Sequence, residues 1–150
     1  MKPTLHFASD HAAVDLRCTL QQAAEGWGFV VVDHGPATTD SIDYPLQATK
    51  IAHALADDGQ ALGVLVCGTG IGMSMVANRF SHLRAAAVSD TFSAAATRQH
   101  NDANVLCIGA RTVGPGLAED LLKTFVETAF EGGRHSRRVA LFPPGFEIEE

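Results

Sequence analysis

The chain has 150 residues, the usual size of one domain and enough to bury a substantial core. Apolar residues make up 46% of the chain and charged residues 19%, which is ordinary for a globular protein. The formal net charge of -6 makes nucleic acid and anionic membrane surfaces poor partners. A phosphate site would therefore have to be a local arrangement of cations.

The N-terminus lacks the shape of a signal peptide, and no apolar run is long enough to span a bilayer. The three cysteines, Cys18, Cys67 and Cys107, are odd in number and widely spaced, without the spacing of a zinc site. We therefore expect a cytoplasmic protein with reduced thiols and no membrane association.

Five short apolar runs predict β-strands. Runs that are apolar at consecutive positions suit strands buried on both faces, as in parallel sheets. In chain order, the predicted strands are Leu5–Ser9, Phe29–Asp33, Leu62–Cys67, Arg84–Val88 and Val105–Ile108.

The stretches between these runs have the period of amphipathic helices. The first stripe expected to face the core consists of Ala13, Leu16, Leu20, Ala23 and Trp27. The second starts after Pro45, with Ala48, Ile51, Ala52, Leu55 and Ala56, and the last consists of Leu117, Leu121, Phe125 and Ala129. Two further helices are expected, one with Met75, Val76 and Phe80 facing inward, and one at Ala94–Ala96 behind the capping types Ser89 and Asp90.

Strand and helix alternate along the chain, which predicts right-handed crossovers and a parallel sheet covered on both faces. We expect residues 1–150 to form a single three-layer α/β/α domain with a five-stranded parallel sheet, Rossmann-like in architecture. Residues 132–150 are expected to form a C-terminal tail that opens with a basic cluster. Open sheets of this kind bind ligands at the carboxyl ends of their strands, so the residues after each strand are candidates for function.

The segment Cys67–Gly72 follows the third strand and has glycine at every second position from Gly68. Glycine permits a sharp turn and a close approach of backbone to ligand. A helix is expected to begin here, and the N–H groups of a helix start attract anions and favour the thiolate form of a nearby cysteine. The segment thus offers a base and an anion site side by side. A buried, inert cysteine beside an ordinary glycine turn is the alternative interpretation.

Three other motifs of this kind do not match the segment. A cysteine-dependent phosphatase needs arginine six positions after the cysteine, where this chain has Met73. A Walker loop needs Gly-Lys-Ser/Thr, but Gly72 is followed by Met73 and Ser74. The three glycines are also spaced more narrowly than in the dinucleotide-binding fingerprint.

A basic cluster occupies residues 134–138. Arg134 and Arg138 are four residues apart, so on a helix they would share a face and could grip a phosphate with two guanidinium groups. A solvated charge run is the alternative. Of the seven histidines, His11 and His100 lie at predicted strand ends, where a functional role is favoured, and none of the seven has metal-ligand spacing. We therefore expect no metal site.

Several longer motifs occur in order along the chain: Ser9-Asp10-His11, Asp43-Tyr44-Pro45, Cys67–Ser74 with Ala77-Asn78-Arg79, Arg98–Leu106, Gly109-Ala110-Arg111 and Glu131-Gly132-Gly133-Arg134-His135. Taken together, they resemble ribose-5-phosphate isomerase type B, whose wider family includes galactose-6-phosphate and allose-6-phosphate isomerases. Together they cover roughly residues 4–140. One branch of the family has a glutamate base where this chain has Met73, so the chain resembles the cysteine-bearing branch. A longer terminal helix is common in the family, but Pro143 and Pro144 would stop one here.

The resemblance implies roles for these residues. Cys67 would move the proton, His100 would help to open the sugar ring, and Asp10 would assist there. The enediolate would be surrounded by Thr69, Asn101 and the backbone of Gly68, Gly70, Ile71 and Gly72. The phosphate would be bound by His11, Arg111, Arg134 and Arg138, the last two from a second subunit, and Tyr44 would line the pocket. The resemblance also implies a homodimer, often paired into a tetramer, with the active site at the subunit interface and no cofactor.

We therefore expect an enzyme that interconverts ribose 5-phosphate and ribulose 5-phosphate by proton transfer through an enediolate. The same chemistry on a tetrose 4-phosphate, allose 6-phosphate or galactose 6-phosphate is an alternative, because pocket length is not readable from the sequence. A non-catalytic sugar-phosphate-binding subunit is a second alternative. A thiol redox protein is a third, although Cys67 lacks a nearby resolving cysteine in the sequence.

Overall fold

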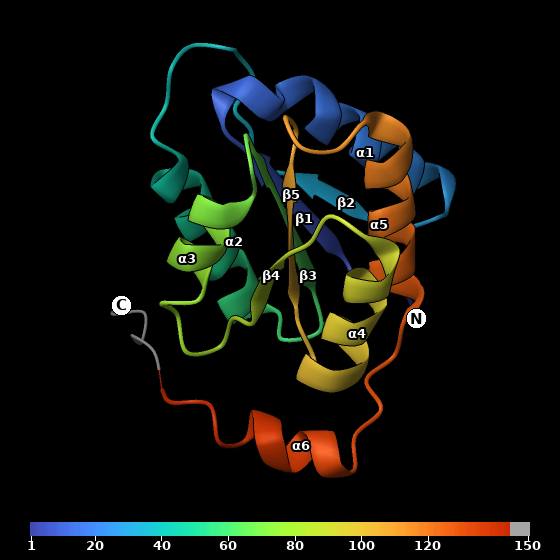
Figure 1. Cartoon of the computed structure of the whole chain (residues 1–150). Helices are drawn as coiled ribbons and strands as arrows, with labels where there is room; N and C mark the ends of the chain where they lie inside the picture. Colours follow the sequence, from blue (N-terminus) through green and yellow to red (C-terminus); the bar gives the residue numbers. More distant parts are fainter. Residues whose placement is uncertain (145–150) are drawn as a thin grey trace.

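A computed structural model describes residues 1–144, which form a five-stranded sheet with helices on both faces (Figure 1). The strands are β1 (Leu5–Ser9), β2 (Val31–Asp33), β3 (Leu62–Cys67), β4 (Ala85–Ala87) and β5 (Val105–Gly109). Their order across the sheet is β2-β1-β3-β5-β4, and every neighbouring pair is parallel. The predicted three-layer α/β/α fold is confirmed. Residues 145–150 of the predicted tail lie outside the described residues.

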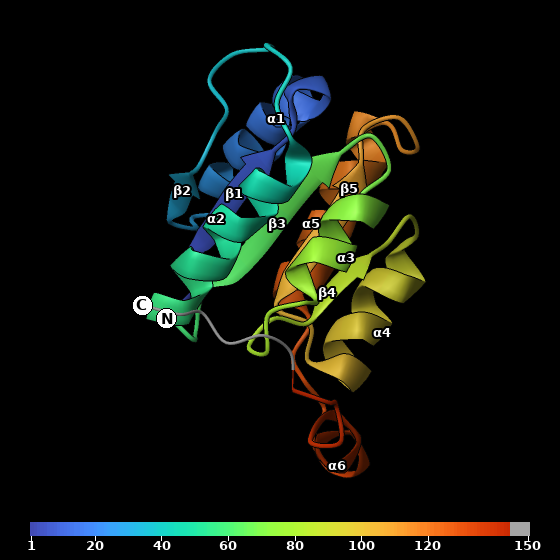
Figure 2. The ribbon, with the colours of Figure 1, turned by 90° about the vertical axis from the view of Figure 1, so that its left-hand side faces the viewer.

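Two helical layers enclose the sheet. One layer consists of α1 (Val14–Gly26), which follows the short 3-10 helix η1 (His11–Ala13), together with α4 (Thr91–Asn101) and α5 (Pro115–Glu127). The other layer consists of α2 (Tyr44–Asp57) and α3 (Ile71–Ala77), which lie in front of the sheet in Figure 2. The last helix, α6 (Arg134–Val139), lies at the edge of the sheet where the strands begin (Figure 1). Within residues 1–144, no helix has the length and apolar character needed to cross a bilayer.

Side chains of the central strands alternate between the two layers, as the two-residue period of a strand requires. Leu5 and Phe7 of β1 pack with α1 and α5, whereas Ala8 packs with α2. In β3, Val64 and Val66 face the first layer, while Leu65 and Cys67 face the second. Both faces of β3 are buried, which explains why its sequence is apolar at consecutive positions.

Two predicted strands are shorter than expected because their first residues have other hydrogen-bond partners. The amide of Phe29 donates to the carbonyl of Ala24 at 3.1 Å, so Phe29 belongs to the turn that closes α1, and β2 begins at Val31. The amide of Arg84 donates to the Asn104 side chain at 2.7 Å, and β4 begins one residue later. In contrast, β5 extends to Gly109, one residue beyond the prediction.

The inner faces of two helices differ from the predicted stripes. In α3, Met73 is completely buried, whereas Met75 is 64% exposed, because the helix begins at Ile71 and turns Met73 and Ala77 toward the sheet. In α5, Leu117 is 39% exposed, and Ala118 and Leu122 complete the buried face with Leu121 and Phe125. Smaller errors lie at the helix ends: Ala24 is buried in place of Ala23, Ala56 is exposed, and Ala129 is exposed and lies beyond α5.

The two leucines of α5 permit a direct test of this inner face. Leu122→Ala should lower the free energy of unfolding by about 2–5 kcal/mol, because it leaves a cavity against the sheet. Leu117→Ala removes the same atoms from an exposed position and should cost less than about 1 kcal/mol. Denaturant unfolding measures both, and equal losses would contradict the assigned orientation of α5.

Candidate active site

Three strands end side by side along one edge of the sheet, the edge formed by the carboxyl ends of the strands. Because β1, β3 and β5 are adjacent and parallel, the residues that follow them lie side by side. The amide of Asp10 donates to the carbonyl of Val66 at 3.0 Å, and the amide of Ala110 donates to the carbonyl of Cys67 at 2.8 Å. The amide of Arg111 donates to Gly68 at 3.0 Å. Backbone hydrogen bonds therefore bring Asp10, Cys67 and Arg111 to the same edge.

The loop after β3 directs two amides inward. The amide of Gly70 donates to the Sγ atom of Cys67 at 3.1 Å, and the amide of Ile71 donates to the Oγ1 atom of Thr69 at 3.2 Å. Gly70 has φ +76°, and a Cβ atom there would lie 3.0 Å from the amide nitrogen of Ile108. The loop geometry thus requires glycine at this position. An N–H group directed at sulfur stabilises negative charge on it.

Cys67 differs from its buried neighbour Cys107. Cys67 is 6% exposed and has the Gly70 amide as a donor, whereas Cys107 is completely buried on β5. Burial, with a smaller contribution from Cys67, raises the pKa of Cys107 well above its ordinary value, so this side chain remains a neutral thiol. All three cysteines are free. Of the two cysteines in the core, Cys67 is therefore the one with an N–H donor at its sulfur and some exposure.

Polar side chains at the end of β1 are held by local hydrogen bonds. The Nδ1 atom of His11 accepts a hydrogen bond from the amide of Ile42 at 3.2 Å, so a neutral ring carries its proton on Nε2. The Oδ1 atom of Asp10 accepts from the amide of Ala12 at 3.0 Å and caps η1. These contacts fix the backbone around both residues and leave His11 with a donor for a ligand.

Two predicted pocket residues lie against the glycine loop. A Cβ atom at Gly72 would come within 2.8 Å of the Tyr44 ring. A Cβ atom at Gly68 would lie 3.6 Å from the Cδ atom of Arg111. Small residues at these two positions let an aromatic ring and a guanidinium approach the loop closely.

The remaining predicted site residues lie at the opposite edge of the sheet, where the strands begin (Figure 1). His100 and Asn101 are the last two residues of α4, and Arg134 and Arg138 lie on α6. The sequence predicts His100 at a strand end, but it lies in the last turn of α4, ahead of β5, and not after a strand. A helix that connects parallel strands runs back along the sheet, so the end of α4 lies where β5 begins. Figure 1 shows α6 at this same edge.

His100 is part of a second cluster. Its ring stacks on that of His135, with centroids 4.5 Å apart and an angle of 16° between the planes. The Nε2 atom of His135 lies 3.5 Å from the Oε2 atom of Glu131 and 3.5 Å from the Nε atom of Arg134. Burial lowers the pKa of His135, and the nearby His100 and Arg134 act in the same direction, while Glu131 opposes them. His135 was given no role from the sequence, because its contact with His100 joins two separate helices.

The turn after Asn101 is held by two arginines. Asp102 has φ +47° and receives Arg84 at 3.0 Å and Arg98 at 3.3 Å on its carboxylate. Arg84 also donates from Nε to the carbonyl of Asp102 at 2.7 Å. These contacts were not predicted, because an arginine just before β4 gives no sequence signal that it binds a turn after α4. They keep the end of α4 in place.

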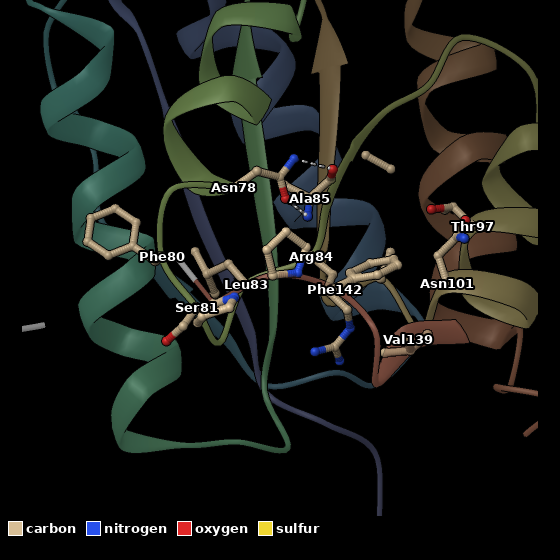
Figure 3. Close-up of a pocket in the computed structure, with 14 residues that line it drawn as sticks. Asn78, Phe80, Ser81, Leu83, Arg84, Ala85, Thr97, Asn101, Val139 and Phe142 are labelled. Carbon is tan, nitrogen blue, oxygen red and sulfur yellow. Dashed lines mark hydrogen bonds between the residues drawn. The ribbon is translucent and has the colours of Figure 1, made fainter. Parts of the chain in front are cut away.

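Asn101 also lines the larger of two cavities near the predicted site residues, with a volume of about 660 Å³. Figure 3 shows Asn101 on one wall, with Val139 and Phe142 from the chain around the end of α6. A smaller cavity of about 230 Å³ lies at the opposite edge and is lined by Thr69, Ile71, Ala87, Val88, Ser89 and Thr112. Neither cavity contains residues from both groups, so within residues 1–144 of one chain the predicted site residues lie in two separate places.

The chain matches known proteins over most of its length. Residues 5–142 match the model of the Ribose/Galactose Isomerase family. Ribose-5-phosphate isomerase B of Escherichia coli is 39% identical over 133 residues, which cover 89% of each chain. D-erythrulose-4-phosphate isomerase of Pectobacterium atrosepticum is 38% identical over 137 residues, covering 91% of this chain and 90% of its own.

Solved structures agree with these matches. Ribose-5-phosphate isomerase B of Mycoplasma genitalium, solved with bound ribulose-5-phosphate, superposes with a TM-score of 0.90 at 37% identity. The superposition covers 93% of both chains. The family match and the matched fold lead to one conclusion: this chain belongs to the ribose/galactose isomerase family.

Proposed function

We propose that this protein is an aldose–ketose isomerase that interconverts ribose 5-phosphate and ribulose 5-phosphate. The observation that carries the proposal is the hydrogen bond from the Gly70 amide to the Sγ atom of Cys67, in a loop beside Asp10 and Arg111. A base, an anion-binding backbone and a cation at one edge are the parts that enediolate chemistry needs. The relative in E. coli and the ribulose-5-phosphate complex from M. genitalium support the choice of substrate.

In this proposal Cys67 acts as the base. The thiolate removes the proton from the carbon next to the carbonyl of the open-chain sugar, and the C–H electron pair forms the double bond of an enediolate. Cys67 then returns the proton to the former carbonyl carbon. The hydroxyl proton of the neighbouring carbon moves to the former carbonyl oxygen, so that the carbonyl lies one carbon further along. Thr69 and the amides of Gly68, Gly70, Ile71 and Gly72 surround the enediolate oxygens, whose negative charge the amides stabilise.

The complete site requires two copies of the chain. Cys67 and His100 lie at opposite edges of one sheet, so a sugar phosphate bound at Cys67 meets His100 and Asn101 of a second copy. A twofold homodimer produces two equivalent sites of this kind. Apolar side chains exposed beside the Cys67 loop support such an interface. They are Ile71 and Met75 of α3, Tyr44 and Leu46 of α2, and Phe92 of α4, between 40% and 80% exposed.

Four basic residues bind the phosphate in this arrangement. His11 and Arg111 belong to the edge that carries Cys67, and Arg134 and Arg138 come from α6 of the second copy. Each guanidinium group can donate two parallel hydrogen bonds to phosphate oxygens. These bonds anchor the sugar phosphate and position its reacting carbons. This local cluster is compatible with the net charge of -6 because it concentrates cations at one place.

A four-carbon substrate is the second candidate, because the relative in P. atrosepticum is named for D-erythrulose 4-phosphate. The mechanism is the same for both sugars, and they differ in the distance between phosphate and carbonyl.

A base that is a free thiol also needs a reducing compartment, so we place the reaction in the cytoplasm.

Turnover by the purified protein, with EDTA present, tests the proposal on ribose 5-phosphate, a tetrose 4-phosphate, allose 6-phosphate and galactose 6-phosphate. We expect the highest kcat/KM for ribose 5-phosphate. Cys67→Ala should lower kcat by about 10²–10⁴ while substrate still binds, because the base is lost and the phosphate contacts remain. Near-normal turnover by Cys67→Ala would contradict the role of this thiol, and absence of turnover on all four sugars would favour a binding subunit.

The glycine loop has its own test. Gly70→Ala should lower kcat/KM by about 10²–10³, because a side chain at φ +76° moves the amide that donates to Cys67. Gly116→Ala is the matched control, since a Cβ atom there meets nothing within 4 Å. Thermal unfolding verifies that both variants fold. If Gly70→Ala folds and is as active as Gly116→Ala, the amide does not support catalysis.

A further inference from the structure

We propose that His100, Glu131 and His135 form a binding site for a divalent transition-metal ion such as Zn²⁺, and that the bound ion inhibits the enzyme. One ligand atom from each of these residues lies within 4.8 Å of the other two. The inhibition rests on the proposed role of His100 in ring opening, whereas metal binding does not depend on that role.

The separations are close to those that zinc requires. Ligand atoms at zinc–nitrogen and zinc–oxygen distances of about 2.1 Å in a tetrahedron lie about 3.4 Å apart. The Nε2 atom of His135 and the Oε2 atom of Glu131 are already 3.5 Å apart. The two ligand atoms that lie farthest apart must approach each other by at most about 1.4 Å. Rotations of the exposed Glu131 side chain and the half-buried His100 side chain can provide this movement.

The scaffold holds these side chains together before any ion binds. His135 is only 5% exposed, and its ring stacks on His100. The amide of Glu131 donates to the carbonyl of Gln99 at 3.1 Å, which ties the glutamate to the residue before His100. The Nε2 atom of His135 is thus held beside the carboxylate of Glu131, in the position that the site requires.

The surrounding charges limit the affinity. Arg134 lies 3.5 Å from the Nε2 atom of His135, and Arg138 is on the same helix. Both repel a cation, and only the Glu131 carboxylate among the three ligands attracts it. We therefore expect a dissociation constant on the order of micromolar rather than nanomolar. Three protein ligands leave a fourth position for water or an anion.

Metal binding would withdraw His100 from catalysis. A nitrogen bound to zinc has no lone pair left to accept the proton of a sugar hydroxyl. The ion would also lie beside Arg134 and Arg138, which are proposed to bind the phosphate. Zinc should therefore slow turnover of ribose 5-phosphate, and EDTA should restore it.

Isothermal titration of the assembled protein with ZnCl₂ tests the site directly. We expect about one ion per chain, with affinity reduced at least tenfold in Glu131→Gln and further in His135→Ala. His53→Ala removes an exposed histidine of α2 and should bind as the wild type does. Cys67→Ser should also retain binding, because the site contains no sulfur. Three results would overturn the site: no binding by the wild type, wild-type affinity in both Glu131→Gln and His135→Ala, or loss of binding in Cys67→Ser.

Inhibition is measured separately. Zinc should inhibit the wild type over the concentration range in which it binds, and Glu131→Gln should need at least tenfold more zinc for the same fractional loss of its own rate. Binding without inhibition would overturn the regulatory part. Absence of isomerase activity in zinc-free buffer would instead contradict the proposed function, and the titration would still decide whether the metal site exists.

Discussion

The parallel pairing of β3 with β1 and β5 is the constraint on which the rest of the structure depends. It aligns the residues after these three strands, and the backbone bonds from Asp10, Ala110 and Arg111 to the β3 end and its loop lock that alignment. The same constraint sends each connecting helix back along the sheet. His100, at the end of α4, must therefore lie far along the sheet from Cys67. The site that we propose uses both residues and therefore needs two copies of the chain.

The glycine loop converts this alignment into chemistry. Gly70 combines three properties: a positive φ, an amide directed at Cys67, and close packing against β5. A thiol in an apolar layer would ordinarily be neutral, as Cys107 is two residues before the end of β5. The difference between the two cysteines is therefore one of hydrogen bonding and slight exposure. Their positions also differ, since Cys67 is the last residue of β3, whereas Cys107 lies inside β5 opposite Leu65.

Much of this could be predicted from the sequence, because parallel strands buried on both faces and helices with regular apolar stripes leave clear patterns. The sheet and the residues around Cys67 follow from such local signals. The buried face of α3 could not be predicted in this way. Met73 and Met75 are chemically alike, and the first residue of the helix decides which one is buried. The contacts of His135 with His100 and of Arg84 with Asp102 join segments distant in the chain, so residue spacing carries no trace of them. The same limit applies to the His100, Glu131 and His135 cluster, whose ligands come from two separate segments.

The central claim is that Cys67 of one copy works with His100 of another, and mixed assemblies test it most directly. Cys67→Ser and His100→Asn chains are each purified, unfolded together, refolded, and assayed on ribose 5-phosphate. Random pairing makes about half of the dimers mixed, each with one intact site, so we predict about a quarter of wild-type activity from two nearly inactive parents. A mixture no more active than the sum of its parents, in refolded dimers shown to contain both chains, would contradict the shared site.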